Sequence, residues 1–502
     1  MFVRLCAAFA SLALLCMPAG ADEPDDIGAL MDRIEEAARV GDGDLAWRTS
    51  VILAGRDELQ DMPAAYAGEI YAFAAWGAAQ RTGEGRDAAL EQALEWVTIG
   101  EELAPTHAYA PALAGDLHLT RDEYELAAEA YLRAFALDDA FIADMSAELV
   151  NPLLYGLRRS GSNEARRRLV AALYTSWWPE DPFVERDLVI MERARIAADH
   201  GDMQTAREAV AELTNASMVE SVQYERRFEP LWERDPDALK AMLAAAVEAE
   251  LDTWRETARA NPGHLRGPMW IADSLRRLGR YEEAVSVLEE TRERALDGRM
   301  TADITDYFNW MLNDLASLYL ALGRVDEAIT VYDEASQLSE RGGDNVSQRL
   351  NTASALLRSG RPFEAIERLE GHETLDMSSF GVGVVMLVLF CAHDQLGDTV
   401  ARDTAFAELL TDTVERAPMI QEAYACMGDL DAAATFMANR LKDPALASGA
   451  LGQLQMNNPS RMEQTTDYAG NLRAHLRILA DHPDVLAALE PVGRIIETGL
   501  YD

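Results

Sequence analysis

Lysine is nearly absent from this chain of 502 residues, in which Lys240 and Lys442 are the only two. The 45 lysines and arginines face 86 aspartates and glutamates, so the formal net charge is −41. Such an acidic surface repels phosphate backbones and anionic lipid headgroups. We therefore expect neither nucleic acid nor an anionic membrane as a partner. Hydrophobic residues still make up 49% of the chain, which excludes wholesale disorder.

Long apolar runs are also missing, except for a short one at the N-terminus. There Arg4 precedes the apolar residues 5–17, small residues follow up to Ala21, and an acidic stretch begins at Asp22. This order is typical of a secretory signal peptide, so we predict cleavage after Ala21 and a periplasmic or secreted protein. Later in the chain, residues 384–391 form the best apolar run and are too short to span a bilayer. We expect no transmembrane segment.

Cysteine is scarce as well. Loss of the signal peptide removes Cys6 and Cys16, which leaves only Cys391 and Cys426. Two cysteines are too few for a scaffold held together by disulfides. We interpret them as small buried hydrophobic residues, and one bridge between neighbouring helices stays open as the alternative.

Alternating β-branched patterns are almost absent, whereas helix-forming residues dominate and glycine or proline recurs every 30 to 45 residues or so. The segment LGRYEEA at 278–284 returns as LGRVDEA at 322–328 and as SGRPFEA at 359–365. In each copy one alanine lies seven residues before the glycine and another five residues after it. These pairs are Ala272 and Ala284, Ala316 and Ala328, and Ala353 and Ala365. The spacing predicts two antiparallel helices, joined by a left-handed glycine and packed closely through the alanines.

This pattern resembles the tetratricopeptide repeat family, whose unit is a helix–turn–helix hairpin. Weaker copies surround Gly41, Gly201 and Gly428, and Asp122 stands where another copy would have its turn glycine. The turn glycines at 279, 323, 360, 397 and 428 are 44, 37, 37 and 31 residues apart, around the family's usual period of about 34. The resemblance implies an all-α fold, a superhelical solenoid of antiparallel helix hairpins.

Two similar segments suggest how the chain is divided. Residues 229–239 and 479–486 share a Pro-Asp-x-Leu core, at Pro236 and Pro483. Many bacterial members of the family carry such a helix after their last repeat, and a solenoid needs an atypical unit to cover its last apolar face. We predict a signal peptide at 1–21, an N-terminal array with its capping helix at 22–240, a C-terminal array at 241–440 and a helical cap at 441–502.

Motifs that carry chemistry are missing. His475 and His482 lie seven residues apart, whereas a helical zinc pair is normally four apart. The chain has no nucleophile elbow and no phosphate loop, and the glycines at 381 and 383 are only a fragment of a dinucleotide motif. We expect no metal, no cofactor and no enzymatic activity. An enzyme with its site between the two arrays remains the alternative.

The family resemblance implies a ligand groove on the concave face, formed by the first helix of each hairpin. The family's groove positions, counted from the first alanine of each copy, give these candidate binding residues: Arg266, Asp273, Arg276, Arg277, Trp310, Asn313 and Arg358. Arginine and asparagine bind carboxylates through charge-assisted hydrogen bonds, and tryptophan offers an anchoring surface. A peptide or protein partner is therefore the leading hypothesis.

By analogy with exported members of the family, we place this scaffold in envelope or exopolysaccharide assembly. A binder of glycans or small ligands is a further alternative. Trp310 and the pair Trp177 and Trp178 would then supply the surfaces on which sugars stack.

Overall fold

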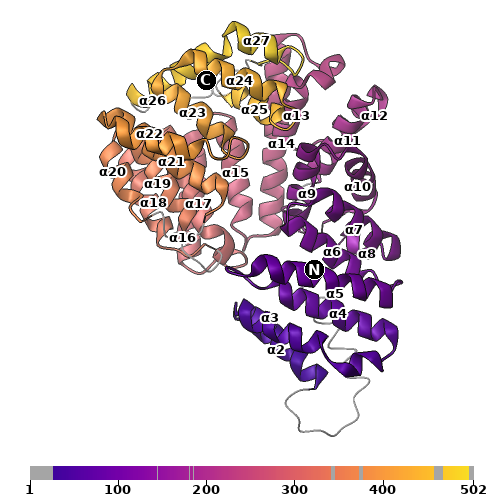
Figure 1. Ribbon diagram of the computed structural model, residues 1–502. Helices are drawn as coiled ribbons and strands as arrows, with labels where there is room; N and C mark the ends of the chain where they lie inside the picture. The colour runs from indigo at the N-terminus through magenta and orange to yellow at the C-terminus, as the bar shows by residue number, and fades with distance from the viewer. Residues whose placement is uncertain are drawn as a thin grey trace. The chain divides into compact units, whose positions relative to one another are not determined.

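The computed structural model describes residues 26–496 except 144, 180, 185, 341–344, 372–376 and 457–466. The predicted signal peptide lies outside the described residues. Every regular element in the described parts is a helix and no β-strand occurs in them, which confirms the all-α prediction (Figure 1). The chain divides into two compact units, residues 1–196 and 197–502. Each unit is treated separately below.

The first unit is a series of helices that run from Ile27 to the unit boundary, which falls inside α11. Its elements are α2 (Ile27–Arg39), α3 (Gly43–Ala54), the 3₁₀ turn η1 (Asp57–Gln60), α4 (Ala64–Ala79), α5 (Arg86–Leu103), α6 (Tyr109–Thr120), α7 (Tyr124–Leu137), α8 (Ala140–Ala143), α9 (Ala147–Ser160), α10 (Asn163–Ser176) and α11 (Asp187–Asp199).

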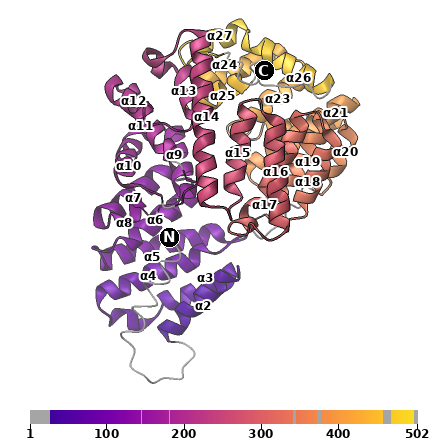
Figure 2. The same ribbon diagram turned by 180° about the vertical axis from the view of Figure 1, so that it is seen from behind.

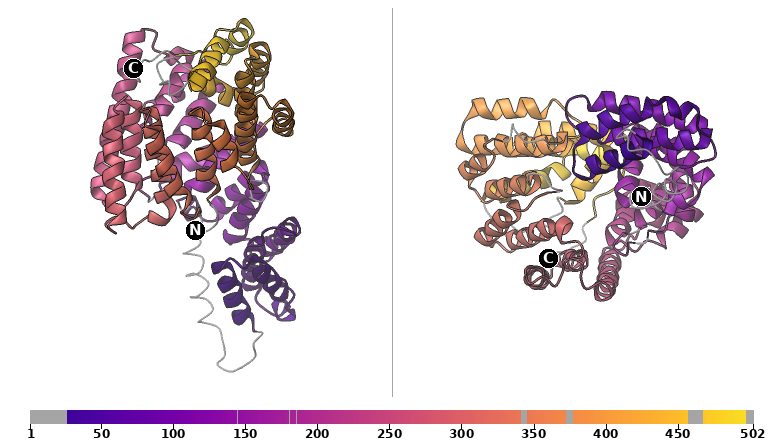
Figure 3. Two further views of the ribbon diagram at one scale, coloured as in Figure 1. Left: turned by 90° about the vertical axis from the view of Figure 1, so that its left-hand side faces the viewer. Right: turned by 90° about the horizontal axis from the view of Figure 1, so that it is seen from below.

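The second unit contains the three clear sequence copies. Its elements are α12 (Met203–Val210), α13 (Ala216–Tyr224), the 3₁₀ turn η2 (Arg226–Leu231), α14 (Pro236–Ala260), α15 (Arg266–Arg277), α16 (Tyr281–Leu296), α17 (Ile304–Ala321), α18 (Val325–Ser336), α19 (Val346–Arg358), α20 (Pro362–Arg368), α21 (Ser379–Leu396), α22 (Thr399–Leu409), α23 (Ala417–Met427), α24 (Leu430–Lys442), α25 (Ala447–Met456), α26 (Asp467–Ala480) and α27 (Pro483–Leu489). The stacking of its helices is visible in both views of Figure 3.

The predicted turns occur where the glycines are. The predicted turn glycines all have positive φ: Gly41 (77°), Gly201 (77°), Gly279 (73°), Gly323 (73°), Gly360 (74°), Gly397 (75°) and Gly428 (69°). Asp122, which replaces the glycine of its copy, has a φ of 58° and is the only non-glycine residue with positive φ in the described part of the chain. Its carboxylate accepts a hydrogen bond of 2.6 Å from the hydroxyl of Tyr124. The repeat register therefore extends through the copy in which glycine is absent.

The spaced alanines lie at the contacts between paired helices. Ala272, Ala316 and Ala353 on the first helices are at most 2% exposed, and their partners five residues after each glycine are fully buried. The small side chains let α15 pack on α16, α17 on α18 and α19 on α20. Large apolar residues beside them, such as Leu275 and Leu288, fill the interior. These contacts confirm the predicted hairpins.

Two kinds of turn chemistry start the second helices. In four hairpins an aspartate directly after the turn glycine accepts a hydrogen bond from the backbone N–H three residues later, which caps the helix N-terminus. These residues are Asp42, Asp202, Asp398 and Asp429, with donor–acceptor distances of 2.9–3.1 Å. In the three clear copies an arginine takes this place and pairs with a glutamate three residues later: Arg280 with Glu283, Arg324 with Glu327 and Arg361 with Glu364.

The two Pro-Asp segments belong to the same unit. Pro236 is the first residue of α14, a helix of 25 residues that packs against α15, as Figure 2 shows. Pro483 begins the short helix α27, which packs against α24. The predicted division at residues 240 and 241 falls inside α14. The division into two compact units falls between residues 196 and 197.

The end of the chain returns to the beginning of the second unit. The Arg226 N–H donates to the Val492 carbonyl (2.8 Å), and the Arg494 N–H donates to the Tyr224 carbonyl (2.9 Å). The Arg494 guanidinium donates to the carbonyls of Gln223 (2.7 Å) and Glu233 (2.9 Å). We name these contacts the closure segment, formed by residues 223–233 and 490–496. It joins parts of the unit that are about 260 residues apart in sequence.

The disulfide left open by the sequence is formed. Cys391 on α21 and Cys426 on α23 are bonded, with Cα atoms 5.9 Å apart. The preferred interpretation, two reduced buried cysteines, is therefore wrong. The sequence could not decide the matter because burial and pairing both favour cysteine at a helix contact. Helix α21 is also long and apolar enough to cross a membrane by length and composition alone. It packs against α19, α20, α22 and α23, and 39% of this stretch is buried.

Candidate functional site

A groove of about 1130 Å³ runs across the first helices of successive hairpins in the second unit. Helices α15, α17, α19, α21 and α23 line it, and residues of α25 also contribute to its wall. This is the face on which the family resemblance places a ligand groove. Because each first helix presents one stripe of side chains, residues from five hairpins meet along a single surface.

Large apolar side chains make up much of the groove wall. Trp270 on α15 is 41% exposed and its ring stacks on Trp254, with centroids 5.9 Å apart. Phe380 on α21 is 55% exposed. Met269, Leu320 and Met419 also line the groove. Exposed aromatic rings beside partly buried aliphatic side chains provide the anchoring surface typical of a protein interface.

Three of the seven predicted site residues line the groove, namely Asp273, Arg276 and Arg358. The Arg276 guanidinium lies 2.5 Å from the carboxylate of Asp273, on the same helix. Arg358 on α19 lies 3.4 Å from the Glu422 carboxylate on α23. Both arginines are thus engaged by carboxylates of this chain.

The other four predicted residues are not among the side chains that line the groove. Arg277 is 6% exposed and its guanidinium lies 3.0 Å from the Glu250 carboxylate of α14. Arg266 lies 3.3 Å from Asp303 at the start of α17, with its guanidinium over the ring of Tyr307.

Each of these two arginines forms an ion pair with a neighbouring segment of the chain. Because Arg277 is buried, its guanidinium is not accessible to a binding partner. Burial raises the pKa of Glu250, and the charge of Arg277 opposes that rise. The contact is therefore part of the packing between α14 and α15. Its place next to the groove residue Arg276 in sequence explains why the repeat register alone assigned it to the groove.

Trp310 and Asn313 lie on α17 and are half-buried. The side-chain amide of Asn313 donates to Asp314 (3.3 Å) and accepts a hydrogen bond of 2.8 Å from the Asn351 amide. Asn313 therefore links the two groove residues Asp314 and Asn351 through hydrogen bonds.

Sequence reasoning missed one whole row of the groove. Trp270, Asp314 and Asn351 all line it, and each lies two residues before the first alanine of its copy. Counting back two residues from the first alanine of each copy, the same alanines that located the hairpins, would have identified these positions. The family positions used for the prediction do not include them.

Asp314 is a groove residue whose pKa is raised. Burial raises its pKa to about 6, the nearby Asp273 adds to the rise, and Asn313 and Arg276 partly oppose it. Its carboxylate has no arginine or lysine within ion-pair distance in the described structure, unlike Asp273 and Glu422. A half-buried carboxylate without a cationic partner is costly to ionise.

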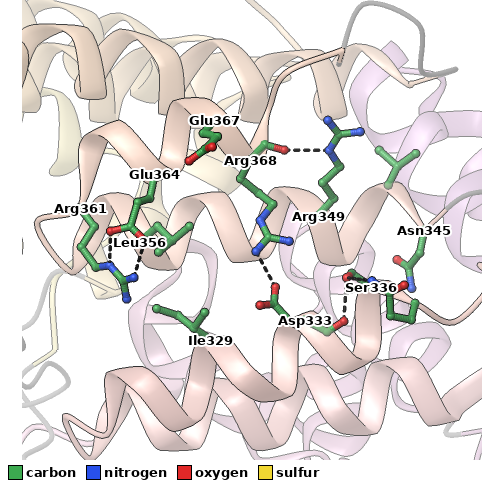
Figure 4. A pocket seen from close by; sticks show the side chains of 12 residues that line it. Ile329, Asp333, Ser336, Asn345, Arg349, Leu356, Arg361, Glu364, Glu367 and Arg368 are labelled. Atoms are coloured by element: carbon green, nitrogen blue, oxygen red, sulfur yellow. Dashed lines mark hydrogen bonds and ion pairs between the residues drawn. The ribbon is translucent and has the colours of Figure 1, made fainter.

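A second pocket, of about 750 Å³, lies between α18, α19 and α20 (Figure 4). Its charged side chains pair with one another: Arg368 with Asp333 at 2.7 Å, and Arg361 with Glu364. The Arg349 guanidinium donates to the Arg368 carbonyl (2.8 Å). The ion pair between Arg368 and Asp333 in this pocket links the hairpin of α19 and α20 to α18 of the preceding hairpin.

The other aromatic and histidine candidates do not line the groove. Trp177 is fully buried and its indole N–H donates to the Met145 carbonyl (2.8 Å). Trp178 is 63% exposed, and the Arg186 guanidinium stacks over its ring. The His482 side chain caps α27. In the described residues no group of three or more His, Cys, Asp or Glu side chains is arranged to hold a metal ion.

Comparison with known proteins agrees with the hairpin geometry. The tetratricopeptide repeat family model matches residues 312–346, which cover most of α17, the Gly323 turn and all of α18. The chain therefore contains a tetratricopeptide repeat at residues 312–346. The matched hairpin is the middle one of the three clear copies. No curated protein sequence matches the chain.

Solved structures similar to this chain include Naa15/Naa10 bound to HypK-THB, the human IFIT1 dimer with PPP-AAAA, and the APC/C hetero-tetramer Cut9–Hcn1. They are 12%, 12% and 13% identical to this chain, and the matches cover 92%, 76% and 93% of it. The matches cover 80%, 87% and 96% of the other chains, with TM-scores of 0.29, 0.31 and 0.29. Similarities at this level carry no argument about function.

Proposed function

We propose that this protein is a scaffold that binds a segment of a partner protein along the groove of its second unit. The observation that carries the proposal is the groove itself, in which exposed Trp270 and Phe380 meet aliphatic side chains from successive hairpins. Soluble proteins seldom expose a contiguous apolar surface of this kind without a binding role.

Binding accounts for the groove better than catalysis does. Its arginines are held by carboxylates of the same chain, and its walls are largely apolar. Such a surface recognises shape and apolar side chains, and we propose that the protein is not an enzyme. The net charge of −41 favours a protein partner over nucleic acid, whose phosphates it would repel.

We further propose that the protein is exported. The order of charge, apolar run and small residues before Asp22 supports this, and so does the bond between Cys391 and Cys426, because structural disulfides persist in oxidising compartments. A role in envelope or exopolysaccharide assembly would agree with export and rests on analogy with exported members of the family.

Photo-crosslinking in the cell tests the proposal. The crosslinking amino acid p-benzoylphenylalanine would replace Phe380 in one variant and Phe363 in a matched control. Phe363 lies on α20, outside the groove, and is 75% exposed. We expect Phe380 to crosslink a discrete protein and Phe363 not to do so.

The same preparation tests export and the type of partner. We expect the mature chain to begin at Asp22 and the crosslinked peptide to map to one short segment of the partner. Equal crosslinking from both positions, or a crosslinked species free of protein, would contradict the proposed function. A mature chain that still carries Met1 would contradict export.

A further inference from the structure

The positive charges of the groove are already used within the chain. Arg276 pairs with Asp273 and Arg358 pairs with Glu422. Because each guanidinium already has a carboxylate of this chain beside it, a partner carboxylate gains less by binding there than at an arginine with no such neighbour. The groove is therefore poorly prepared for an acidic peptide, although the residue types alone suggest one.

The negative charge of Asp314 has no such partner. Its carboxylate accepts one long hydrogen bond, of 3.3 Å, from the Asn313 amide. Asp273 and Asp314 together face the single guanidinium of Arg276, so this trio carries one excess negative charge when Asp314 is ionised. A cation placed beside Asp314 would balance the trio and offset the cost of burying its carboxylate.

Apolar side chains flank this carboxylate within the same groove. Trp270 and Met269 lie on the preceding first helix, and Leu320 lies on α17 with Asp314. Phe380 lies on α21, farther along the series of first helices. The polar row formed by Asp314 and Asn351 thus has apolar anchors beside it. Such a surface complements a segment in which a positive side chain stands close to large apolar ones.

We propose that the groove selects a partner segment with a lysine or arginine next to aromatic or large aliphatic residues, and that Asp314 receives the cation. This rests on the proposed function, because it names the chemistry of the segment bound in the same groove. The sequence analysis predicted the opposite charge for the ligand, because the predicted arginines would bind a carboxylate of the partner.

The proposal carries a pH dependence. A bound cation requires ionised Asp314, whose pKa is about 6 in the free protein, so affinity for a cationic segment falls as the pH drops below that value. Asp273 and Arg276 on α15 act on the pKa of Asp314, and Tyr332 on α18, Arg358 on α19 and Glu422 on α23 line the same groove. The two arginines stay charged throughout this range. The pKa of Tyr332 is raised by burial, so the phenol stays neutral.

A defined peptide library supplies the test. Random dodecapeptides displayed on phage would be selected on the full chain and on the Phe380→Ser variant. Binders lost on Phe380→Ser are groove binders, and we expect them to carry Lys or Arg within three residues of an aromatic or large aliphatic residue. Synthetic copies would then be titrated by fluorescence polarisation, each with its lysine or arginine kept or replaced by norleucine.

For the wild type, norleucine should weaken binding by about 10-fold or more, as expected for a charge-assisted contact. For Asp314→Asn, the lysine and norleucine peptides should bind about equally. Asp306→Asn, an exposed aspartate on the same helix, should behave as the wild type. Because norleucine changes only the ligand, this comparison does not depend on how the protein variants fold.

The outcomes separate the two claims. If Phe380→Ser loses no binders, or if no peptide is enriched, the proposed function fails. If groove binders exist but are acidic, or if norleucine has the same effect on wild type and Asp314→Asn, the function stands and the assignment of the cation to Asp314 is overturned.

Discussion

At the scale of single residues, the deepest charge in the first unit is Glu192 on α11. Three arginines surround its carboxylate: Arg166 at 2.7 Å, Arg195 at 2.8 Å and Arg158 at 2.9 Å. Burial alone would raise the pKa of Glu192, but the charges of Arg195, Arg166 and Arg158 outweigh burial and hold the pKa at about 2. This acid therefore stays ionised in the folded protein well into the acidic range.

We expect Glu192→Gln to destabilise the first unit by about 3 kcal/mol at pH 7, because it leaves three arginines without their shared carboxylate. The folded pKa lies below the ordinary value of 4.5, so the contribution is complete above pH 4.5 and is lost as the pH falls towards 2. Urea unfolding at several pH values measures it, with the exposed Glu91→Gln as control. A difference from wild type that is the same at pH 7 and pH 3 would disprove this account.

Asp122 offers a test of backbone strain, because it holds a left-handed conformation without being glycine. We expect Asp122→Ala to destabilise by about 1 kcal/mol and Asp122→Gly to be at least as stable as wild type. Gly161→Ala isolates the backbone effect, since a Cβ there meets no atom within 4 Å. Thermal unfolding measures all three. An alanine variant at 122 with unchanged stability would show that the turn relaxes.

At the scale of helices and hairpins, the second unit is held together by links between first helices and between turns. In each clear copy, the arginine after the turn glycine also lies near an acidic residue on a helix that precedes its own hairpin. The pairs are Arg280 with Glu248 of α14 (3.7 Å), Arg324 with Glu282 of α16 (3.8 Å) and Arg361 with Asp326 of α18 (3.5 Å). Exposed ion pairs contribute little individually. Their regular recurrence shows that successive hairpins stack in one register.

The disulfide is the covalent link at this scale. We expect the double variant Cys391→Ala/Cys426→Ala to lose about 2–4 kcal/mol of stability, because the bond closes a loop across 35 residues. Thermal unfolding with and without reductant measures the loss. Reductant should lower the melting temperature of the wild type and leave that of the double variant unchanged. Free thiols at both positions in protein isolated without reductant would contradict the bond.

Hairpins are the part of this fold that the sequence predicts best. Glycine at a left-handed turn and alanine at a close helix contact are local requirements, so Gly323 with Ala316 and Ala328 located α17 and α18 directly. The groove was predicted only in part, because it depends on the angular position of each side chain on its helix. Of the residues named from the sequence, Asp273, Arg276 and Arg358 line the groove, whereas Trp270 and Asp314 line it and were not named.

The closure segment was not predictable for a different reason. Arg494 donates mainly to backbone carbonyls, and carbonyls leave no trace in a sequence pattern. The two segments in contact, 223–233 and 490–496, are also far apart in sequence, so no local sequence pattern indicates that they meet. From the resemblance to a solenoid, we predicted a capping helix at the end of each of two arrays, and not a contact between these segments.

At the scale of the whole second unit, Arg494 is the residue on which the closure segment depends most. Its guanidinium lies 4.5 Å from the ring centre of Trp232 and donates to two carbonyls, and burial lowers its pKa. We expect Arg494→Ala to destabilise the closure segment by about 2 kcal/mol, because two partly buried carbonyls lose a charged donor.

Hydrogen exchange measures this effect locally. Amides of residues 223–233 should exchange faster in Arg494→Ala, while those of α17 and α18 should be unchanged. Arg299→Ala, which removes an exposed arginine paired only with Asp297, serves as control. Unchanged protection at 223–233 would show that the backbone contacts around Tyr224 and Val492 hold the closure without the side chain.

The closure segment also limits how this molecule can evolve. An open stack of hairpins gains or loses one unit with little effect on the others, because each hairpin contacts only its neighbours. In the second unit, an added hairpin between α15 and α24 would displace residues 490–496 from the carbonyls that they now meet at 223–233. We therefore expect homologues to keep the number of hairpins in this region constant and to place their insertions in loops. The groove would then have the same length in all homologues, so the length of the bound partner segment would be restricted as well as its sequence.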